Sequence, residues 1–453
     1  MLKQLDSVLI ANRGEIALRI IRACKELGIR SVLAYSEADR DSLPVKLADQ
    51  AICIGPANAA KSYRDPRAII SAALAYKVDA IHPGYGFLAE NADFAAMCEE
   101  EGVGFVGPSS DIIRRMGDKI EAKKIARAAG VPTVPGSLGA IAEYDEALTV
   151  AGEVGYPLLI KAAAGGGGRG MRVVESGQTL EKDLREIMSE AETAFGDPAV
   201  YIERYLTDIR HIEIQVMSDG QSTVHLGERD CTAQRRNQKL IEEGPSPVLD
   251  DKLREGLTKA AVALCQEVGY RNAGTVEFVF DNVERQYYFI EMNTRIQVEH
   301  PVSEMITGID LIKLQLEIAA GNPLPMAQEE ITIRGHAIEC RINAEDPQKG
   351  FLPNPGLIKD FRAPGGFGVR LDTHIEAGYV VPPFYDSMVG KLIVWGQDRN
   401  EAIDRALRAI EEMKIDGVIT TAQFQGEIID SDVFRSGDFN TAFVAEFLAN
   451  KAS

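Results

Sequence analysis

One run of the sequence, Tyr287–Pro301 (YYFIEMNTRIQVEHP), restrains the fold more than any other. The side chains of a β-strand alternate between the two faces of a sheet. With that period, from residue 291 to residue 299, one face carries charged and amide side chains, namely Glu291, Asn293, Arg295, Gln297 and Glu299, and the other carries Met292, Thr294, Ile296 and Val298. An ordinary edge strand would carry solvent-tolerant Thr, Ser and Lys in this row, so the pattern is typical of a ligand site.

The residues before this run predict a β-hairpin. Thr275–Asp281 is expected to form one strand, Asn282–Arg285 the turn, and Gln286–Asn293 the returning strand. This register pairs Glu277 with Glu291, and directly opposed side chains have Cβ atoms about 4.5–5.5 Å apart. Two like charges so close are destabilising unless a divalent cation lies between them. The alternative is a solvated sheet face on which both carboxylates point into water.

Glu277, Glu291 and Asn293 supply the carboxylate and amide oxygens that suit Mg²⁺ or Mn²⁺. We therefore expect a metal site here, with phosphates completing the coordination shell. In a fully extended chain, Glu291 and Glu299 would lie about 26 Å apart. The chain is thus expected to bend after about Asn293, before a helix that begins near Val302.

The composition is that of an ordinary soluble globular protein. With 453 residues, 45% hydrophobic and 26% charged, the chain can form two or three domains with a large core. The formal net charge of −19 argues against nucleic acid as a partner, because such proteins need a basic surface. We expect no membrane span and no signal peptide, because no sufficiently long apolar run is present. The six cysteines show no CxxC spacing, which indicates a reducing cytoplasm and no structural zinc.

The first 110 or so residues predict a doubly wound α/β domain. A strand at Ser7–Ala11, a helix at Ile16–Leu27 and a strand at Ser31–Tyr35 form a βαβ unit, which implies a parallel sheet. The turn of this unit reads ANRGEIA and lacks the dinucleotide fingerprint GxGxxG. Further helices and strands are expected, in alternation, at Pro66–Tyr76, Ala80–His82, Ala92–Glu101 and Gly104–Val106.

The segment His82–Asn91 (HPGYGFLAEN) lies just beyond the carboxyl end of a predicted strand. Ligands bind at such positions in open α/β sheets. A tight loop that needs the conformational freedom of glycine explains the same residues equally well.

A second glycine-rich segment lies between two predicted strands. Lys161 ends an apolar strand, Gly165–Gly170 follows with Arg169 inside it, and Met171–Glu175 resumes as a strand. A Walker A loop would need GK[ST] and a following helix, and both are missing. The pattern instead predicts a hairpin flap whose N–H groups close over phosphates. A flexible linker is the alternative.

Two further segments contribute cations. A lysine-rich helix is expected at Asp111–Gly130, followed by a proline-containing linker at Val131–Gly136. Arg235, Arg236 and Lys239 form a cluster after a predicted strand, for which a solvated surface loop is the usual explanation.

The remainder, Ile331–Ser453, predicts short strands separated by Gly/Pro turns, with closing helices such as Asn400–Met413. Arg341 lies in the middle of one of these strands. A half-buried arginine in a strand is more often a structural ion-pair partner than a catalyst.

With these motifs placed, the chain resembles biotin carboxylase of the ATP-grasp superfamily over essentially its full length. The segments that carry the resemblance are LIANRGEIA, HPGYGFLAEN, MGDK, KAAAGGGGRGMRVV, RHIEIQV, ERDCTAQRRNQK, FIEMNTRIQVEHPV, ECRINAED and YDSMVGKL. General ATP-grasp ligases share only the flap and the carboxylate–asparagine pattern, so the combination is specific to this family.

The resemblance implies an ATP-grasp fold of mixed α/β and α+β class. It has an N-terminal doubly wound parallel-sheet domain, a mobile glycine-rich lid and a C-terminal mixed β domain. The corresponding boundaries are 1–118 for the N-terminal domain, 119–323 for the ATP-grasp region with its lid at 134–206, and 331–453 for the C-terminal domain.

The resemblance also implies roles for individual residues. Those matching the ATP site are Lys119, Lys161, Gly166, Gly167, Glu203, Leu206, His211, Glu277 and Glu291. Those matching the metal ligands are Glu277, Glu291 and Asn293, as the hairpin argument suggests independently. Those matching the bicarbonate pocket are Lys239, Arg295, Gln297, Val298 and Glu299, and those on the biotin side are Tyr85, Glu90 and Arg341.

In the implied reaction, ATP phosphorylates bicarbonate to carboxyphosphate, and Glu299 acts as the general base. Lys239 and Arg295 belong to the same catalytic group. Carboxyphosphate releases CO₂ beside biotin, the freed phosphate deprotonates the ureido nitrogen, and Arg341 stabilises the resulting anion. Closure of the glycine flap excludes water that would hydrolyse the intermediate.

Two residues depart from the family pattern. Ala164 stands where glycine is frequent, which stiffens the flap, and Asn237 stands where histidine is common. The second difference puts in doubt any nucleotide or phosphate contact by that side chain, but not the role of Lys239.

The implied partners are a biotin carboxyl carrier protein, carboxyltransferase subunits and a second copy of the chain. No Ala-Met-Lys-Met acceptor is present, and Met413–Ile415 is its nearest match, so the carrier is expected to be a separate chain. This arrangement is that of multisubunit acetyl-CoA carboxylase, in the cytoplasm or in the plastid stroma, which supplies fatty-acid synthesis.

Three alternatives remain open at this point. One is another ATP-grasp ligase that acts through carbamoyl or acyl phosphate. Another is a catalytically silent regulatory or scaffold subunit. The third keeps the chemistry but serves pyruvate or propionyl-CoA carboxylation.

Overall fold

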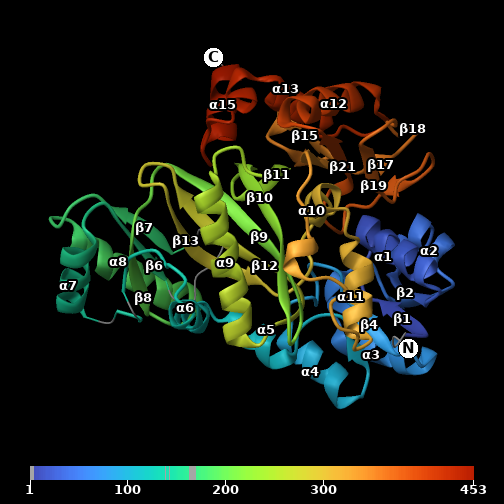
Figure 1. Ribbon diagram of the computed structural model, residues 1–453, viewed down its shortest axis with the longest axis horizontal. Coiled ribbons are helices and arrows are strands. Elements are labelled where there is room, and N and C mark those ends of the chain that lie inside the picture. Colours follow the sequence, from blue (N-terminus) through green and yellow to red (C-terminus); the bar gives the residue numbers. More distant parts are fainter. Residues whose placement is uncertain (1–4, 138, 142, 163–169, 453) are drawn as a thin grey trace. The chain divides into compact units, whose positions relative to one another are not determined.

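The computed structural model describes residues 5–137, 139–141, 143–162 and 170–452 (Figure 1). The chain forms two compact units. The first contains Met1–Gly130, His211–Glu277 and Glu291–Ser453, and the second contains Val131–Arg210 and Phe278–Ile290. No helix within the described ranges combines the length and the apolar character that crossing a bilayer requires.

The first unit begins with a five-stranded parallel sheet in the order β3-β2-β1-β4-β5. Its strands are β1 (Ser7–Ile10), β2 (Arg30–Ser36), β3 (Gln50–Gly55), β4 (Ala80–His82) and β5 (Gly104–Phe105). Its helices are α1 (Gly14–Leu27), α2 (Leu43–Leu47), α3 (Pro66–Tyr76) and α4 (Ala92–Glu100). The doubly wound domain is therefore confirmed, although β3 was not expected, because this half-exposed edge strand lacks a buried apolar run.

The strand order reverses between β1 and β4, so the loops that follow these two strands meet at a topological switch point. Asn12, just after β1, donates from Nδ2 to the carbonyl oxygens of Pro83 and Tyr85, both at 2.7 Å. Gly84 has φ +62° and lies against Asn12, so a side chain there would be strained and crowded. The glycine geometry thus holds the HPGYGF segment against the first turn.

The prediction of one continuous lysine-rich helix at Asp111–Gly130 is wrong. Two helices, α5 (Ser110–Gly117) and α6 (Lys119–Ala128), meet at Asp118, which has φ −82° and ψ 113°. The Asp118 carboxylate accepts the N–H groups of Ile120 and Glu121 and so begins a new helix. Lys119 is consequently the first residue of α6 and is exposed.

An eight-stranded sheet has the order β13-β12-β9-β10-β11-β14-β21-β19. Its strands are β9 (Ile209–Asp219), β10 (Thr223–Arg235), β11 (Gln238–Gly244), β12 (Arg271–Asp281), β13 (Gln286–Asn293), β14 (His336–Asn343), β19 (Val369–Thr373) and β21 (Met388–Gly396). The predicted strands of the hairpin, which correspond to β12 and β13, are confirmed. The C-terminal strands β14, β21 and β19 belong to the same sheet, because β14 pairs antiparallel with β11.

The surface loop considered for the Arg235–Lys239 cluster is wrong for Arg235 and Lys239, which lie on strands, and holds only for the exposed turn that contains Arg236. β10 continues to Arg235 and pairs antiparallel with β11 through a turn at Arg236 and Asn237. Both turn residues have positive φ, +49° and +63°, as a two-residue hairpin with the right-handed strand twist requires. Because the turn contains no glycine, the usual residue signal for such a hairpin is missing. Lys239 is therefore held on a strand.

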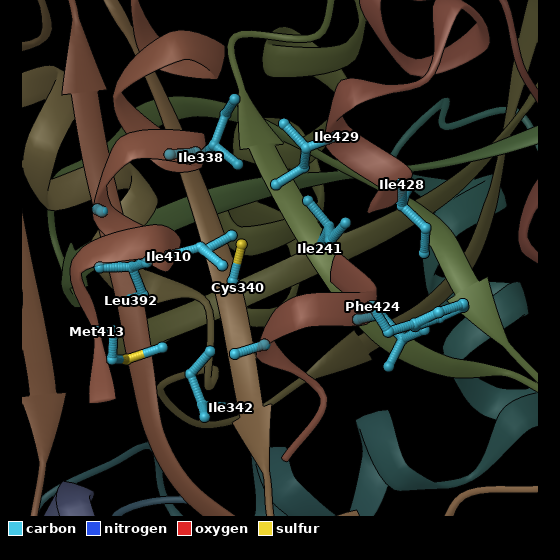
Figure 2. Close-up of a cluster of buried hydrophobic side chains, with 14 of the residues drawn as sticks. Ile241, Ile338, Cys340, Ile342, Leu392, Ile410, Met413, Phe424, Ile428 and Ile429 are labelled. Atoms are coloured by element: carbon cyan, nitrogen blue, oxygen red, sulfur yellow. The ribbon is translucent and has the colours of Figure 1, made fainter. Parts of the chain in front are cut away.

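The C-terminal core lies between β11, β14, β21 and helices α12 (Arg399–Glu412) and α13 (Ala422–Asp430). Figure 2 shows alternate residues of β14, namely Ile338, Cys340 and Ile342, among the apolar side chains of this cluster. Because strand side chains alternate, Glu339 and Arg341 lie on the opposite face of the sheet. That face is packed by α10 (His300–Thr307), which contacts β10, β11, β14 and β21.

The second unit contains a three-stranded sheet in the order β7-β6-β8. Its elements are α7 (Tyr144–Val154), β6 (Leu158–Ala162), β7 (Met171–Val174), α8 (Leu180–Phe195) and β8 (Val200–Arg204). β6 and β7 pair antiparallel with Lys161 opposite Met171, so the two strands flanking the glycine-rich segment form the predicted hairpin. Ala164, Gly166 and Gly167 lie outside the described residues.

The remaining elements lie in the first unit. The helices are α9 (Asp251–Val268), α11 (Leu311–Ala319), α14 (Asp432–Ser436) and α15 (Phe443–Ala452). The short strands are β15 (Glu345–Asp346), β16 (Leu352–Pro353), β17 (Gly356–Leu357), β18 (Asp360–Arg362), β20 (Val380–Val381) and β22 (Lys414–Asp416).

Candidate active site

Lys239 on β11 lies at the centre of a buried ionic cluster. Its Nζ is 2.6 Å from Glu299 Oε1, 2.7 Å from Glu213 Oε2 and 3.3 Å from Glu277 Oε1. Only 13% of the side chain is exposed. Burial lowers the pKa of this ammonium, but the surrounding anionic groups outweigh it and raise the pKa well above its ordinary value. The lysine therefore stays charged and holds three carboxylates together.

Glu277 on β12 accepts hydrogen bonds from two of the polar residues that follow it. Oε1 accepts from Asn293 Nδ2 at 2.7 Å and from Gln297 Nε2 at 3.0 Å. His211 Nε2 lies 3.0 Å from Oε2. Burial favours the neutral acid, yet Lys239 and His211 hold the pKa of Glu277 well below its usual range. Glu277 is thus a carboxylate, as a metal ligand must be.

Glu291 on β13 is only partly buried, and the charges around it conflict. Burial raises its pKa first, and the carboxylates of Glu277 and Glu90 raise it further. Lys119 and His211 act in the opposite direction. Glu291 and Glu277 are therefore close enough to repel one another. A divalent cation would relieve this repulsion, so the donor set of Glu277, Glu291 and Asn293 fits Mg²⁺ or Mn²⁺.

Two other groups of metal-ligand type occur among the described residues. They are His211 with Glu213 and Glu277, and Glu213 with Cys231 and Glu299. The Nζ of Lys239 contacts carboxylates of both groups. Arg229 also pairs with Glu213, and Arg341 with Glu299, so protein cations already lie against the carboxylates that these groups add to Glu277.

The chain bends after Asn293, as expected, because α10 begins at His300 instead of the strand continuing. Arg295 lies in this bend. Its Nε donates to Glu90 Oε2 at 2.8 Å, its NH1 to Gln297 Oε1 at 2.7 Å, and its NH2 to Asn293 Oδ1 at 3.1 Å. The guanidinium thus connects the predicted biotin-side Glu90 with the predicted bicarbonate and metal residues.

Arg341 on β14 approaches the cluster from the C-terminal strands. Its NH2 donates to Glu299 Oε2 at 2.9 Å, and its Nε donates to Glu242 Oε1 at 2.6 Å. Glu299 is fully buried. Burial would raise the pKa of Glu299, but Lys239 and Arg341 hold it well below its usual range. This carboxylate is therefore ionised and shared by two cations.

Tyr85 and Val298 lie next to a further buried lysine. Lys391 on β21 donates to the carbonyl oxygen of Val298 at 2.7 Å and lies 3.1 Å from Glu15 Oε1. Tyr85 donates its hydroxyl proton to the same Glu15 oxygen. Its ring lies with its centroid 5.8 Å from Lys391 Nζ. Lys391 thereby connects three parts of the chain. It contacts the HPGYGF segment at Tyr85, helix α1 at Glu15 and the segment before Glu299 at Val298.

Three described residues of the predicted ATP site, namely Lys161, Glu203 and Leu206, lie in the second unit. Lys161 Nζ on β6 is 2.6 Å from Oε2 of the buried Glu203 on β8, and the two strands are antiparallel neighbours. Leu206 follows β8 and is half-buried. The structure brings Lys161 and Glu203 together within this unit.

Several residues of the cluster were not predicted from the sequence, namely Glu15, Glu213, Arg229, Glu242, Glu339 and Lys391. Arg229 and Glu213 are fully buried and form an ion pair at 2.6 Å. One sequence signal was present, because charged residues interrupt otherwise apolar strand patterns at Glu213, Glu242 and Lys391. Their partners are distant in sequence, so the pattern alone could not say what neutralises them.

Comparison with protein-family models agrees with the observed elements. Residues 4–113 match the biotin carboxylase N-terminal domain, residues 118–327 match the ATP-binding domain of the carbamoyl-phosphate synthase L chain, and residues 339–446 match the biotin carboxylase C-terminal domain.

Individual relatives match along nearly their whole length. Biotin carboxylase 1 of Bacillus subtilis is 55% identical, with 98% of this chain and 99% of the relative covered. A pyruvate carboxylase subunit of Methanothermobacter thermautotrophicus is 52% identical, with 98% and 90% covered. Among solved structures, the biotin carboxylase domain dimer of Hydrogenobacter thermophilus 2-oxoglutarate carboxylase, in complex with MgADP, ADP and bicarbonate, gives a TM-score of 0.90. It is 48% identical to this chain, with 98% of each chain covered.

Proposed function

Because the chain belongs to the biotin carboxylase family of ATP-grasp enzymes, we propose that it carboxylates biotin with bicarbonate at the expense of ATP. The biotin is held on a separate carrier protein. The observation that carries the residue assignments is the position of Lys239, whose Nζ contacts both Glu277 and Glu299. One cation thus links the predicted metal ligands to the predicted base.

In the first step, bicarbonate binds among Lys239, Arg295, Gln297 and the backbone of Val298. Glu299 accepts its proton, and the bicarbonate oxygen attacks the γ-phosphorus of ATP, so that ADP leaves and carboxyphosphate forms. The low pKa of Glu299 in the free protein comes from Lys239 and Arg341. A bound anion that shares these cations weakens their effect, so it raises the proton affinity of Glu299 when the base is needed.

In the second step, carboxyphosphate breaks into CO₂ and phosphate. The phosphate takes the proton of the biotin ureido nitrogen, which then attacks CO₂. Arg341 stabilises the negative charge that develops on the ureido oxygen, since its guanidinium remains charged at any working pH. Tyr85 and Glu90 line the biotin side.

Glu277, Glu291 and Asn293 would hold Mg²⁺ or Mn²⁺, which would supply positive charge to offset that of the nucleotide phosphates. Further nucleotide contacts come from Lys119, Lys161, Gly166, Gly167, Glu203, Leu206 and His211. The ion pair between Lys161 and Glu203 supports this assignment, because it keeps the lysine side chain on the sheet of the second unit. We assign residues 134–206 as the lid, within domains 1–118, 119–323 and 331–453.

The first assembly we propose is acetyl-CoA carboxylase, with a biotin carboxyl carrier protein, carboxyltransferase subunits and a homodimer of this chain, in the cytoplasm or the plastid stroma. The similarity to Biotin carboxylase 1 of Bacillus subtilis supports it. A second assembly, a pyruvate-type carboxylase, is favoured by the 52% identity to a component of pyruvate carboxylase.

The test of the reaction is ATP cleavage by the purified chain with and without bicarbonate and free biotin. We expect bicarbonate to be required and biotin to accelerate the reaction. An equal rate of ATP cleavage with and without bicarbonate would contradict the proposal. Affinity purification from the native cells, followed by identification of the biotinylated protein and its acyl-transfer subunits, distinguishes the two assemblies.

A further inference from the structure

Two glutamates behind Arg341 face each other in the sheet. Glu242 on β11 and Glu339 on β14 are directly opposed in the antiparallel register. Both side chains are fully buried. Side chains so paired have Cβ atoms about 5 Å apart, where two negative charges are destabilising. No role is assigned to either residue by the reaction described above.

The charges that face this pair come from every neighbouring element. They are Lys239 on β11, Arg341 on β14, Lys391 on β21 and Glu299 at the start of α10. Arg341 and Lys391 are themselves opposed across β14 and β21. The two lysines already have carboxylate or carbonyl partners in Glu213, Glu299, Glu15 and Val298.

The hydrogen bonds of the two glutamates are unequal. Glu242 Oε1 accepts from Arg341 Nε at 2.6 Å. Neither oxygen of Glu339 has a hydrogen-bond partner among the described residues. An ionised carboxylate that is buried without a partner is strongly destabilising, whereas the neutral acid is far less so. Burial raises the pKa of Glu339, which accepts no hydrogen bond from the described residues, well above its usual value. Burial raises the pKa of Glu242, which accepts one hydrogen bond from Arg341, only to about 7.

We propose that Glu242 is a positioning residue for Arg341, and that Glu339 is kept as the neutral acid so that the pair carries its single negative charge on Glu242. This inference rests on the proposed function. Arg341 is then fixed at two ends, by Glu242 at Nε and by Glu299 at NH2. Its NH1 makes no hydrogen bond within the described ranges and is the group left to meet the ureido oxygen.

The first test compares Glu242→Gln with Glu339→Gln. Glutamine keeps the size of the side chain but removes the charge, so it imitates a neutral acid. We expect Glu242→Gln to lower kcat for carboxylation of free biotin at least about tenfold more than it lowers bicarbonate-dependent ATP cleavage. For Glu339→Gln, we expect a loss of less than about threefold in both, because a neutral group already stands there.

A uniform loss of both activities in Glu242→Gln, or an equal loss in the two variants, would overturn the inference. A wild-type chain without bicarbonate-dependent ATP cleavage would instead overturn the proposed function and this inference with it. Thermal unfolding of each variant shows whether it is folded, and Glu242→Asp, which keeps the charge, should recover part of the lost biotin carboxylation.

The second test is a double-mutant cycle with Arg341→Ala. If Glu242 acts through Arg341, then Glu242→Gln lowers biotin carboxylation by less than about twofold once Arg341 is absent. In the double variant Glu299 keeps its contact with Lys239, and thermal unfolding of all four proteins of the cycle shows whether each is folded. Losses that multiply across the cycle would show that Glu242 acts independently and would overturn the inference.

Discussion

Nζ of Lys239 lies 2.6 Å from Oε1 of Glu299, and solvent reaches little or none of either side chain. The general base assigned to bicarbonate is therefore in contact with a permanent cation before substrate arrives. Its basicity depends on whether a bound anion competes for that cation.

Replacement of Glu299 by glutamine separates binding from chemistry. In Glu299→Gln, the side chain keeps its size but cannot take the bicarbonate proton, so we expect bicarbonate-dependent ATP cleavage to fall by about 10²-fold or more. Nucleotide affinity, measured by calorimetry with ADP, should change little. Turnover near the wild-type level would contradict the general-base role.

Replacement of Glu291 by glutamine tests the metal site. Glu291→Gln removes one of the two carboxylates that repel each other, so the free protein should be as stable as the wild type or more so. Its apparent affinity for Mn²⁺ in the presence of ADP, followed by electron paramagnetic resonance, should fall about tenfold or more. Glu213→Gln is not a suitable control, because that residue neutralises Lys239 and Arg229. Asp93→Asn, an exposed change in α4, is the matched control and should leave Mn²⁺ affinity unchanged.

The free energy of unfolding is expected to depend on pH because of the buried carboxylate of Glu243. This carboxylate accepts hydrogen bonds from His336 at 2.7 Å and from Arg399 at 2.6 Å. Burial alone would raise its pKa, but these partners lower it to about 2. Because the folded-state pKa lies below the unfolded one, the stabilisation is complete above about pH 4.3 and is lost as the pH falls toward 2.

We therefore expect Glu243→Gln to be less stable than the wild type at pH 7 by about 3 kcal/mol, with the difference shrinking as the pH approaches 2. Urea unfolding at several pH values measures this. The exposed pair of Asp360 and Lys414 provides the control, since Asp360→Asn should show no such pH-dependent difference. A difference that stays constant with pH would mean that packing, and not charge, accounts for the effect of Glu243.

The Arg236–Asn237 turn gives a prediction about the backbone. Asn237 has φ +63°, a conformation that asparagine and glycine adopt readily and β-branched residues do not. Asn237→Val should lower the free energy of unfolding by about 1–2 kcal/mol, whereas Asn237→Gly should leave it nearly unchanged. Equal stability of the two variants would show that this turn is not restrained by its neighbours.

Local patterns were sufficient for much of the fold. The β12–β13 hairpin followed from period-two alternation around a turn, and the parallel N-terminal sheet followed from apolar strands that alternate with helices. The metal ligands Glu277, Glu291 and Asn293 were proposed because they lie within one hairpin. The break between α5 and α6 was missed because one aspartate, Asp118, begins a helix inside a continuous lysine-rich pattern.

Pairing across long stretches of chain could not be predicted in this way. The contact between Arg341 and Glu242 joins residues 99 apart, and that between Lys391 and Val298 joins residues 93 apart. Their proximity depends on β14 pairing with β11 and β21, which no local period encodes. The resemblance to a known family supplied the role of Arg341. That Glu242 and Glu339 oppose each other beside Arg341 follows only from the pairing of β11 with β14.

The pairing of β11 with β14 also bears on how such enzymes can be recombined. A chimera that exchanged residues 331–453 between relatives would cut across hydrogen-bonded neighbours that carry Lys239 on one side and Arg341 on the other. Exchange of the C-terminal region should therefore impair bicarbonate activation as well as biotin carboxylation, unless the β14 strand of the donor pairs with β11 of the recipient in the same register.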